Sequence, residues 1–175
     1  MTNLDLRPDC ARCDALCCVL LAFDASDAFA FSKPACAPCR NLAADNTCKV
    51  HASLADEGFS GCVAFDCQGA GQRITEQVFK GRSWRDDPAL LPAIDTAFRV
   101  MRRLHDAVGL LQQAATLPLS QAQNQTRLDL LARLDANRDW TEDSLLALDL
   151  GPDLKAVPAF LASLRPLISP KPSRR

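Results

Sequence analysis

The sequence predicts a mainly α-helical protein whose amino-terminal part is an irregular, loop-rich cysteine segment with little β structure. All nine cysteines of the 175-residue chain lie between Cys10 and Cys67, in a stretch interrupted by prolines and glycines. The remainder has apolar residues at helical spacing and carries helix-capping signals. We therefore expect a cysteine-cluster metal-binding domain over residues 1–72 and a small helical bundle over residues 73–175 that packs on it.

The cysteines are arranged in short motifs that each hold two donor groups. These motifs are Cys10-x2-Cys13, Cys17-Cys18, Cys36-x2-Cys39, Cys48-x2-His51 and Cys62-x4-Cys67. A two-residue gap lets both sulfurs of a pair bind one ion from a tight turn. Adjacent thiols cannot point the same way in a regular element, so one of Cys17 and Cys18 serves a second metal or packs. Such a density of thiols indicates either disulfides or metal.

The expected compartment decides between these two chemistries. The first ten residues lack the basic start, apolar core and cleavage site of a signal peptide. We therefore expect a reducing cytoplasm, where a disulfide framework does not persist. An odd number of cysteines also fits disulfides poorly, and free buried thiols would explain only one or two of them. Metal binding is the favoured interpretation.

Composition narrows the function classes further. A hydrophobic fraction of 48% and a net charge of −1 are typical of a soluble globular protein. There is no basic excess that would predict nucleic-acid binding. No apolar run approaches about 18 residues, so no membrane partner is expected. We recognise no catalytic constellation, which leaves open whether the chain is an enzyme.

Taken together, the motifs resemble the YkgJ-type cysteine-cluster family, whose members are described as zinc- or iron-chelating domains. The match is carried by Cys10-x2-Cys13-x3-Cys17-Cys18, Pro38-Cys39-Arg40-Asn41-Leu42, Cys48-Lys49-Val50-His51 and Cys62-x4-Cys67. It covers residues 10–72, and residues 59–72 are similar to an actinobacterial-type branch. The resemblance implies a set of metal ligands: Cys10, Cys13, Cys17, Cys18, Cys39, Cys48, Cys62 and Cys67.

Two further potential donors, Cys36 and His51, do not belong to the ligand set that the resemblance implies. Cys36 lies outside the family's cysteines. The family accepts Tyr at the position of His51, and Tyr can replace His as a hydrogen-bond donor to a thiolate but not as a zinc ligand. We therefore expect His51 to support a ligand rather than to bind the metal, with direct ligation as the alternative.

The ligand set leaves the metal and the function open. All-thiolate sites suit zinc, Cu(I) or an iron–sulfur cluster. The ligands divide into two four-thiolate sites or one cluster with spare thiols, so we expect zinc or an iron–sulfur cluster. Three functions follow: a metal-binding module with a structural or interaction role toward a protein partner, an iron–sulfur electron-transfer protein, and a metal storage or delivery protein.

Helices are expected after the cysteine segment. Asp87-Pro88 is a helix start, followed by an apolar stripe at intervals of three and four: Ile94, Phe98, Met101, Leu104, Val108 and Leu111. Ser120 and Gln123 form a capping box for a second helix. Thr141 starts a third helix that Gly151-Pro152 ends, and Pro158 opens a last one.

The remaining expectations concern smaller features. Within the cysteine segment we expect a small hairpin over residues 19–31 and a helical turn from Ser53 that Gly58 ends. Asp66 is expected to order its loop through a hydrogen bond, and His105 to be a surface or internally satisfied histidine. Arg102 and Arg103 suit an anion or a solvated helix face. Residues 171–175 form a basic tail that we expect to fray.

Overall fold

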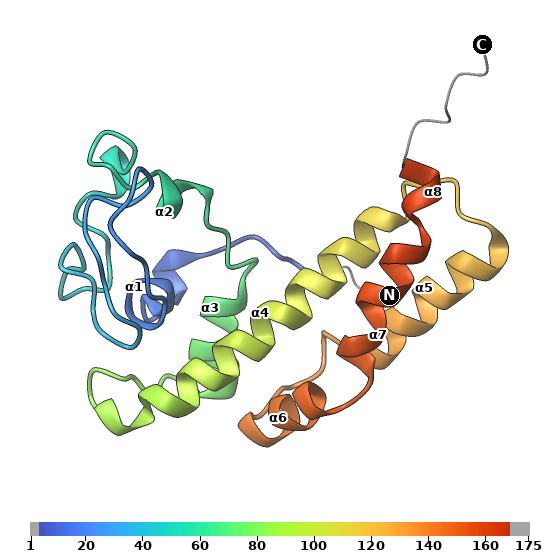
Figure 1. Cartoon of the computed structure of the whole chain (residues 1–175). Coiled ribbons are helices and arrows are strands. Elements are labelled where there is room, and N and C mark those ends of the chain that lie inside the picture. The colour runs from blue at the N-terminus through green and yellow to red at the C-terminus, as the bar shows by residue number, and fades with distance from the viewer. Residues whose placement is uncertain (1–3, 169–175) are drawn as a thin grey trace, which may run out of the picture.

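The computed structural model describes residues 4–168 and is mainly helical, as the sequence predicts (Figure 1). Within that range β structure is limited to isolated bridges, which join Phe23 with Lys33, Ser26 with Phe29, and Leu42 with Cys48. The basic tail at residues 171–175 lies outside the described residues. The expected fold class, a helical protein with an irregular amino-terminal half, is confirmed.

The long helix α4 (Leu91–Ala114) runs through the middle of the molecule and contacts α1, α3, α5, α6 and α7. Every residue of the predicted apolar stripe is buried on it. The predicted start is also present, because the Asp87 carboxylate accepts a hydrogen bond from the Ala89 N–H at 3.0 Å and caps the 3-10 helix Pro88–Leu90. α4 then follows directly and provides the surface on which both halves of the chain pack.

The carboxyl-terminal helices are α5 (Gln121–Leu134), α6 (Glu142–Leu150), α7 (Asp153–Ser163) and α8 (Arg165–Ile168). The capping box at Ser120 is present, and Thr141 caps α6 with a second one. The predicted helix start at Pro158 is wrong, because Pro158 lies inside α7. Burial of Leu154, Val157 and Phe160 outweighs the backbone hydrogen bond that a proline removes.

Residues 10–67, called the cysteine lobe from here on, are mostly loop. They contain the 3-10 helix Cys10–Arg12, α1 (Leu16–Leu20), the 3-10 helix His51–Ser53 and α2 (Ser60–Ala64). The hairpin predicted over residues 19–31 is wrong in its first part, since Val19 belongs to α1. The helical turn predicted from Ser53 is present as a single turn, in which the Glu57 N–H donates to the Ser53 carbonyl at 2.9 Å and Gly58 follows with φ +80°.

The physical reason for α1 is the spacing of its apolar residues. Leu16, Val19 and Leu20 repeat at three and four, the helical period, and all three are buried. They belong to one hydrophobic core that continues through Ala70 and Ile74 into α4. Packing on α4 therefore selects helix where the apolar run alone also allowed a strand.

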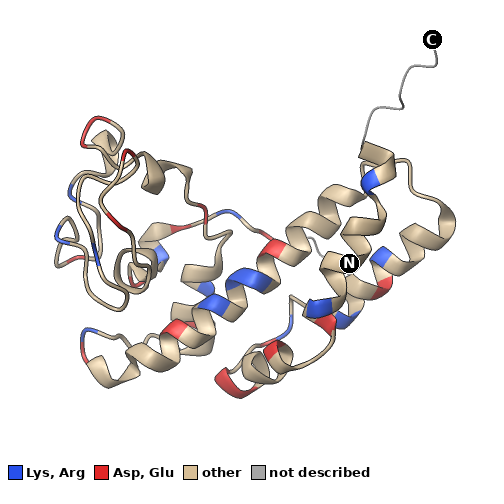
Figure 2. Ribbon diagram, viewed as in Figure 1, with Lys and Arg blue, Asp and Glu red and all other residues tan. Residues whose placement is uncertain are grey.

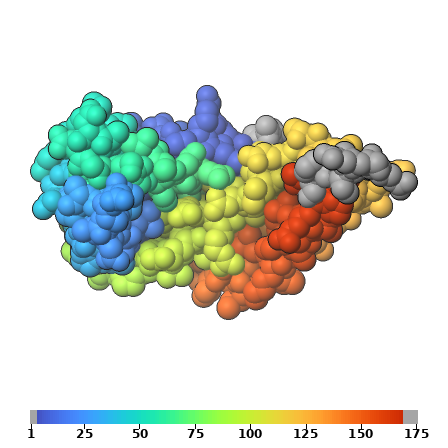
Figure 3. Space-filling model, turned by 45° about the horizontal axis from the view of Figure 1, so that its top comes forward, coloured from blue at the N-terminus to red at the C-terminus, as the bar shows by residue number. Residues whose placement is uncertain are grey.

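The lobe is joined to α4 by α3 (Ala70–Arg73) and a π-helical turn (Ile74–Val78). Figure 3 shows the lobe on one side of α4 and the carboxyl-terminal helices on the other. Contacts between distant residues fix this arrangement: Trp84 Nε1–H donates to the Asp14 carbonyl at 2.9 Å, and the Asp14 N–H donates to Thr75 Oγ1 at 3.1 Å.

Candidate metal centre

All nine cysteines are free thiols, and they come from separate segments of the cysteine lobe. Their side chains are gathered loosely. Within residues 4–168, no three Cys, His, Asp or Glu side chains are grouped closely enough to hold one metal ion as they stand. The thiols nevertheless fall into two neighbourhoods, which the contacts below define.

The first thiol group consists of Cys10, Cys13 and Cys67, which surround the start of α3. A Cβ atom placed on Gly71 would lie 2.5 Å from the Cys13 sulfur and 3.9 Å from the Cys67 sulfur. A side chain at this position would therefore displace the Cys13 thiol, while the Cys67 thiol would remain at an ordinary contact distance. The pKa of Cys13 is raised to about 12, chiefly by burial and also by the charges of Cys17, Cys67 and Cys10, while a backbone hydrogen bond with Leu16 opposes the change.

The second thiol group consists of Cys18, Cys39, Cys48 and Cys62. The Cys39 N–H donates to the Cys18 carbonyl at 3.0 Å, and the bridge between Leu42 and Cys48 brings Cys48 beside the same loop. Burial raises the pKa of Cys62, and the charges of Cys17, Cys39 and Cys48 add to the effect. Backbone contacts and charge effects thus place these four cysteines in one neighbourhood of the lobe.

Cys17 lies between the two groups. Its sulfur is 3.9 Å from that of Cys18. The charge of Cys17 raises the pKa of Cys13 in the first group and of Cys62 in the second. The pKa of Cys17 itself is raised, chiefly by the hydrogen bond with Cys18 and then by burial. Without a cation the thiols whose pKa is raised hold their protons, namely Cys10, Cys13, Cys17 and Cys62. A bound metal would replace those protons because thiolates are the ligands.

Cys36 and His51 are the remaining donors that the sequence singled out. The Cys36 N–H donates to the Leu20 carbonyl at 3.3 Å, and its backbone has φ +54°, a left-handed conformation that few residues adopt. His51 is exposed and opens a 3-10 helix, where its N–H donates to the Cys48 carbonyl at 3.2 Å.

The sequence did not single out two residues that shape this region, Gly71 and Lys33. Gly71 carried only the general signal of a glycine-rich turn. Lys33 looked like a loop lysine, yet it is buried and its ammonium bonds three carbonyl oxygens. No pattern in the neighbouring residues distinguishes such a lysine from an exposed one.

The loop after Cys67 is tied to α4 by a histidine. The Gln68 N–H donates to Asp66 Oδ1 at 2.6 Å, which confirms the predicted loop-ordering role of Asp66. His105 is buried, with its Nδ1 2.6 Å from the Gln68 carbonyl and its Nε2 3.3 Å from Arg73 Nη1. A carbonyl requires Nδ1–H and a guanidinium requires an acceptor, so His105 is neutral. The expectation of a satisfied histidine is confirmed.

This environment changes the acidity of His105. Its pKa is lowered to about 4, chiefly by burial and also by the positive charge of Arg73, while the bond to Gln68 opposes the change. His105 is thus a neutral hydrogen-bonding link between the end of the lobe and α4 at neutral pH.

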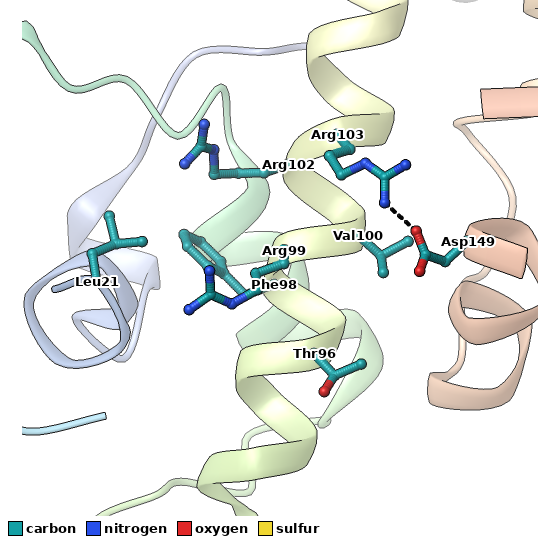
Figure 4. A pocket seen from close by; sticks show the side chains of 8 residues that line it. All are labelled: Leu21, Thr96, Phe98, Arg99, Val100, Arg102, Arg103 and Asp149. Atoms are coloured by element: carbon teal, nitrogen blue, oxygen red, sulfur yellow. Dashed lines mark hydrogen bonds and ion pairs between the residues drawn. The ribbon is translucent and has the colours of Figure 1, made fainter. Parts of the chain in front are cut away.

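A pocket of about 420 Å³ lies along α4 between the cysteine lobe and α6 (Figure 4). Along this helix three arginines lie between two aspartates, Asp95 and Asp106 (Figure 2). The pocket's arginines are paired: Arg99 with Asp95 at 2.8 Å, Arg102 with Asp106 at 3.8 Å, and Arg103 with Asp149. These pairings support the prediction of a solvated helix face more than that of an anion site.

Comparisons with known proteins place the chain only broadly. It is 36% identical over 118 residues to YybG of Bacillus subtilis (strain 168), an uncharacterized protein. The matched region is 67% of this chain and 42% of YybG, so the chain spans less than half of that relative's length. No family model matches the sequence, and no solved structure matches it either. Among the described residues, no helix has the length and apolar character needed to cross a membrane.

Proposed function

We propose that the chain is a metal-binding protein that holds zinc or an iron–sulfur cluster in its cysteine lobe, where the metal has a structural role. The donors are thiolates, which suit both kinds of centre. The proposed ligands are the eight cysteines of the two thiol groups and the residue between them: Cys10, Cys13, Cys67, Cys17, Cys18, Cys39, Cys48 and Cys62.

The observation that carries this proposal is the scarcity of other stabilising contacts around the thiols. From Leu21 to Gln68, all of which the structure describes, the only buried side chains are Phe59 and Lys33. Loops without a core need another source of folding free energy, and metal binding is such a source. The thiols of the lobe would supply the donors.

The resemblance to the YkgJ-type family supports the same chemistry, because the family's motif positions are those of the two thiol groups. We also propose, with the sequence, that residues 1–72 form the metal-binding domain and residues 73–175 the helical one. A cytoplasmic location would keep the thiols reduced. The exposed helical surface would then be available to a protein partner.

Anaerobic purification followed by metal and sulfide analysis tests the proposal. Zinc without sulfide and a colourless protein would indicate structural zinc. Iron with equimolar sulfide and a brown protein with absorbance near about 400 nm would indicate a cluster and favour the electron-transfer function. A metal that a weak chelator removes rapidly would favour storage or delivery. A protein that binds neither under reducing conditions would contradict the proposal.

Cysteine variants show which thiols are ligands. Replacing any of the eight proposed ligands with Ser should reduce the bound metal, because a hydroxyl is a poor substitute for a thiolate. Cys36→Ser is the matched control, since it changes a cysteine of the same lobe outside both groups. Equal metal loss in all nine variants would reject this ligand assignment.

A further inference from the structure

Lys33 is a lysine in an unusual environment. Its residue is 5% exposed, although lysines are rarely buried without a partner for their charge. Its backbone is held in place by two hydrogen bonds with Phe23: the Lys33 N–H donates to the Phe23 carbonyl at 2.8 Å, and the Phe23 N–H donates back at 3.0 Å. The side chain therefore starts from a defined position inside the cysteine lobe.

Three backbone carbonyls orient the ammonium group. Nζ donates to the carbonyls of Val19 at 2.9 Å, Pro34 at 3.0 Å and Ala37 at 2.7 Å. An ammonium has three hydrogens, so all of its donors are used. Carbonyls are neutral, so these bonds satisfy the donors but leave the positive charge unbalanced.

The groups near Lys33 that could carry a negative charge are thiols. Within residues 4–168, no carboxylate forms an ion pair with it. Burial lowers the pKa of Lys33, and the thiolates that oppose this lowering are, in order, those of Cys39, Cys18, Cys36 and Cys17. Two of the bonded carbonyls also belong to residues beside the second thiol group, since Val19 follows Cys18 and Ala37 precedes Cys39 by two positions.

We propose that Lys33 is a built-in counter-cation for the metal–thiolate centre formed by the second thiol group. This inference rests on the proposed function. Four thiolates carry more charge than one divalent ion neutralises, so a centre of this kind keeps a net negative charge. The Lys33 ammonium, which is held by the carbonyls of Val19 and Ala37 near Cys18 and Cys39, offsets that charge. Lys33 is thus a positioning residue that favours metal binding without touching the metal.

The experiment compares Lys33→Gln and Lys33→Arg with the full-length wild-type protein, with Co²⁺ as the probe under anaerobic reducing conditions. Gln keeps hydrogen-bond donors but removes the charge, whereas Arg keeps the charge in a larger group. Competition with a chelator measures affinity, and thiolate-to-cobalt absorbance reports how much metal is bound. We expect Lys33→Gln to weaken Co²⁺ binding about 10–100-fold, the usual effect of residues that support metal ligands, and Lys33→Arg to restore most of it.

The outcomes separate this inference from the proposed function. If the wild-type protein binds no Co²⁺, the proposed function fails. If it binds Co²⁺ and Lys33→Gln binds it with the same affinity, only the counter-cation role is overturned. Equal weakening in the Gln and Arg variants also overturns that role, because it would show that Lys33 acts through packing and hydrogen bonds rather than charge.

Discussion

The cysteine lobe and the helical region are held together by different interactions. In the helical region, α4 presents a buried apolar stripe to its neighbours, and capping boxes begin α5 and α6. In the cysteine lobe, most of residues 21–68 are exposed or half-buried, and the cysteines among them are half-buried except for the exposed Cys62. The helical region is thus stabilised by a hydrophobic core. The cysteine lobe has little such core, and we propose that a metal bound by its thiols stabilises it instead.

The interface between the two regions is built from both kinds of contact. Leu16, Val19 and Leu20 of α1 join the core on α4. Polar links add to it, among them the His105 bond to Gln68 and the hydrogen bond from Trp84 to Asp14. The end of the lobe nearest α4 should therefore survive treatments that unfold its distal loops.

Metal removal is the change that should separate the two regions most. If the proposed metal stabilises the lobe, a chelator should unfold most of residues 21–68 and leave α4 to α7 folded. Hydrogen exchange resolved by segment is the measurement, with circular dichroism to follow the total helix content. An apo protein that keeps its exchange protection throughout the lobe would contradict the proposed division.

Acid should weaken the link between the regions through His105. An unfolded histidine binds a proton below about pH 6.5, but buried His105 stays neutral to about pH 4. Between these values the unfolded state binds more protons, so the free energy of unfolding falls as the pH falls, by about 3 kcal/mol in total.

The control for this prediction is His105→Gln, which offers an amide in place of the imidazole and does not titrate. Its stability should fall less than that of the wild type between about pH 6.5 and pH 4. Urea unfolding at several pH values measures the difference. Parallel pH profiles for the two proteins would show that His105 does not contribute the expected pH dependence.

A methyl group at Gly71 should damage the first thiol group. In Gly71→Ala the new Cβ would lie 2.5 Å from the Cys13 sulfur, so the thiol must move, at a cost of about 1–3 kcal/mol. We expect weaker metal binding with the helical region intact. Gly81→Ala is the matched control, because it meets no atom within 4 Å and carries only the strain of its φ of +79°.

The smallest effect is expected at His51, which is exposed at the edge of the second thiol group. His51→Tyr should keep the full metal content, because a tyrosine hydroxyl can still donate to a thiolate. His51→Ala should bind metal more weakly, by about tenfold at most. Loss of a whole equivalent of metal in the Tyr variant would identify His51 as a direct ligand.

The sequence by itself determined the features that depend on neighbouring residues. The stripe on α4, the caps at Asp87, Ser120 and Thr141, and the end of α6 at Gly151 were all predictable because helix formation is governed by contacts within a few positions. The thiol chemistry was predictable for the same reason, since Cys-x2-Cys pairs are local motifs.

Only the tertiary structure decided which distant residues meet. Gly71 shapes the surroundings of Cys13, and Arg12 pairs with Glu76, across intervals of about sixty positions. The burial of Lys33 depends on where α1 ends relative to a later loop. Tertiary packing also makes α1 a helix, and it keeps Pro158 inside α7. Such contacts arise from the summed burial of many side chains, which no local pattern contains.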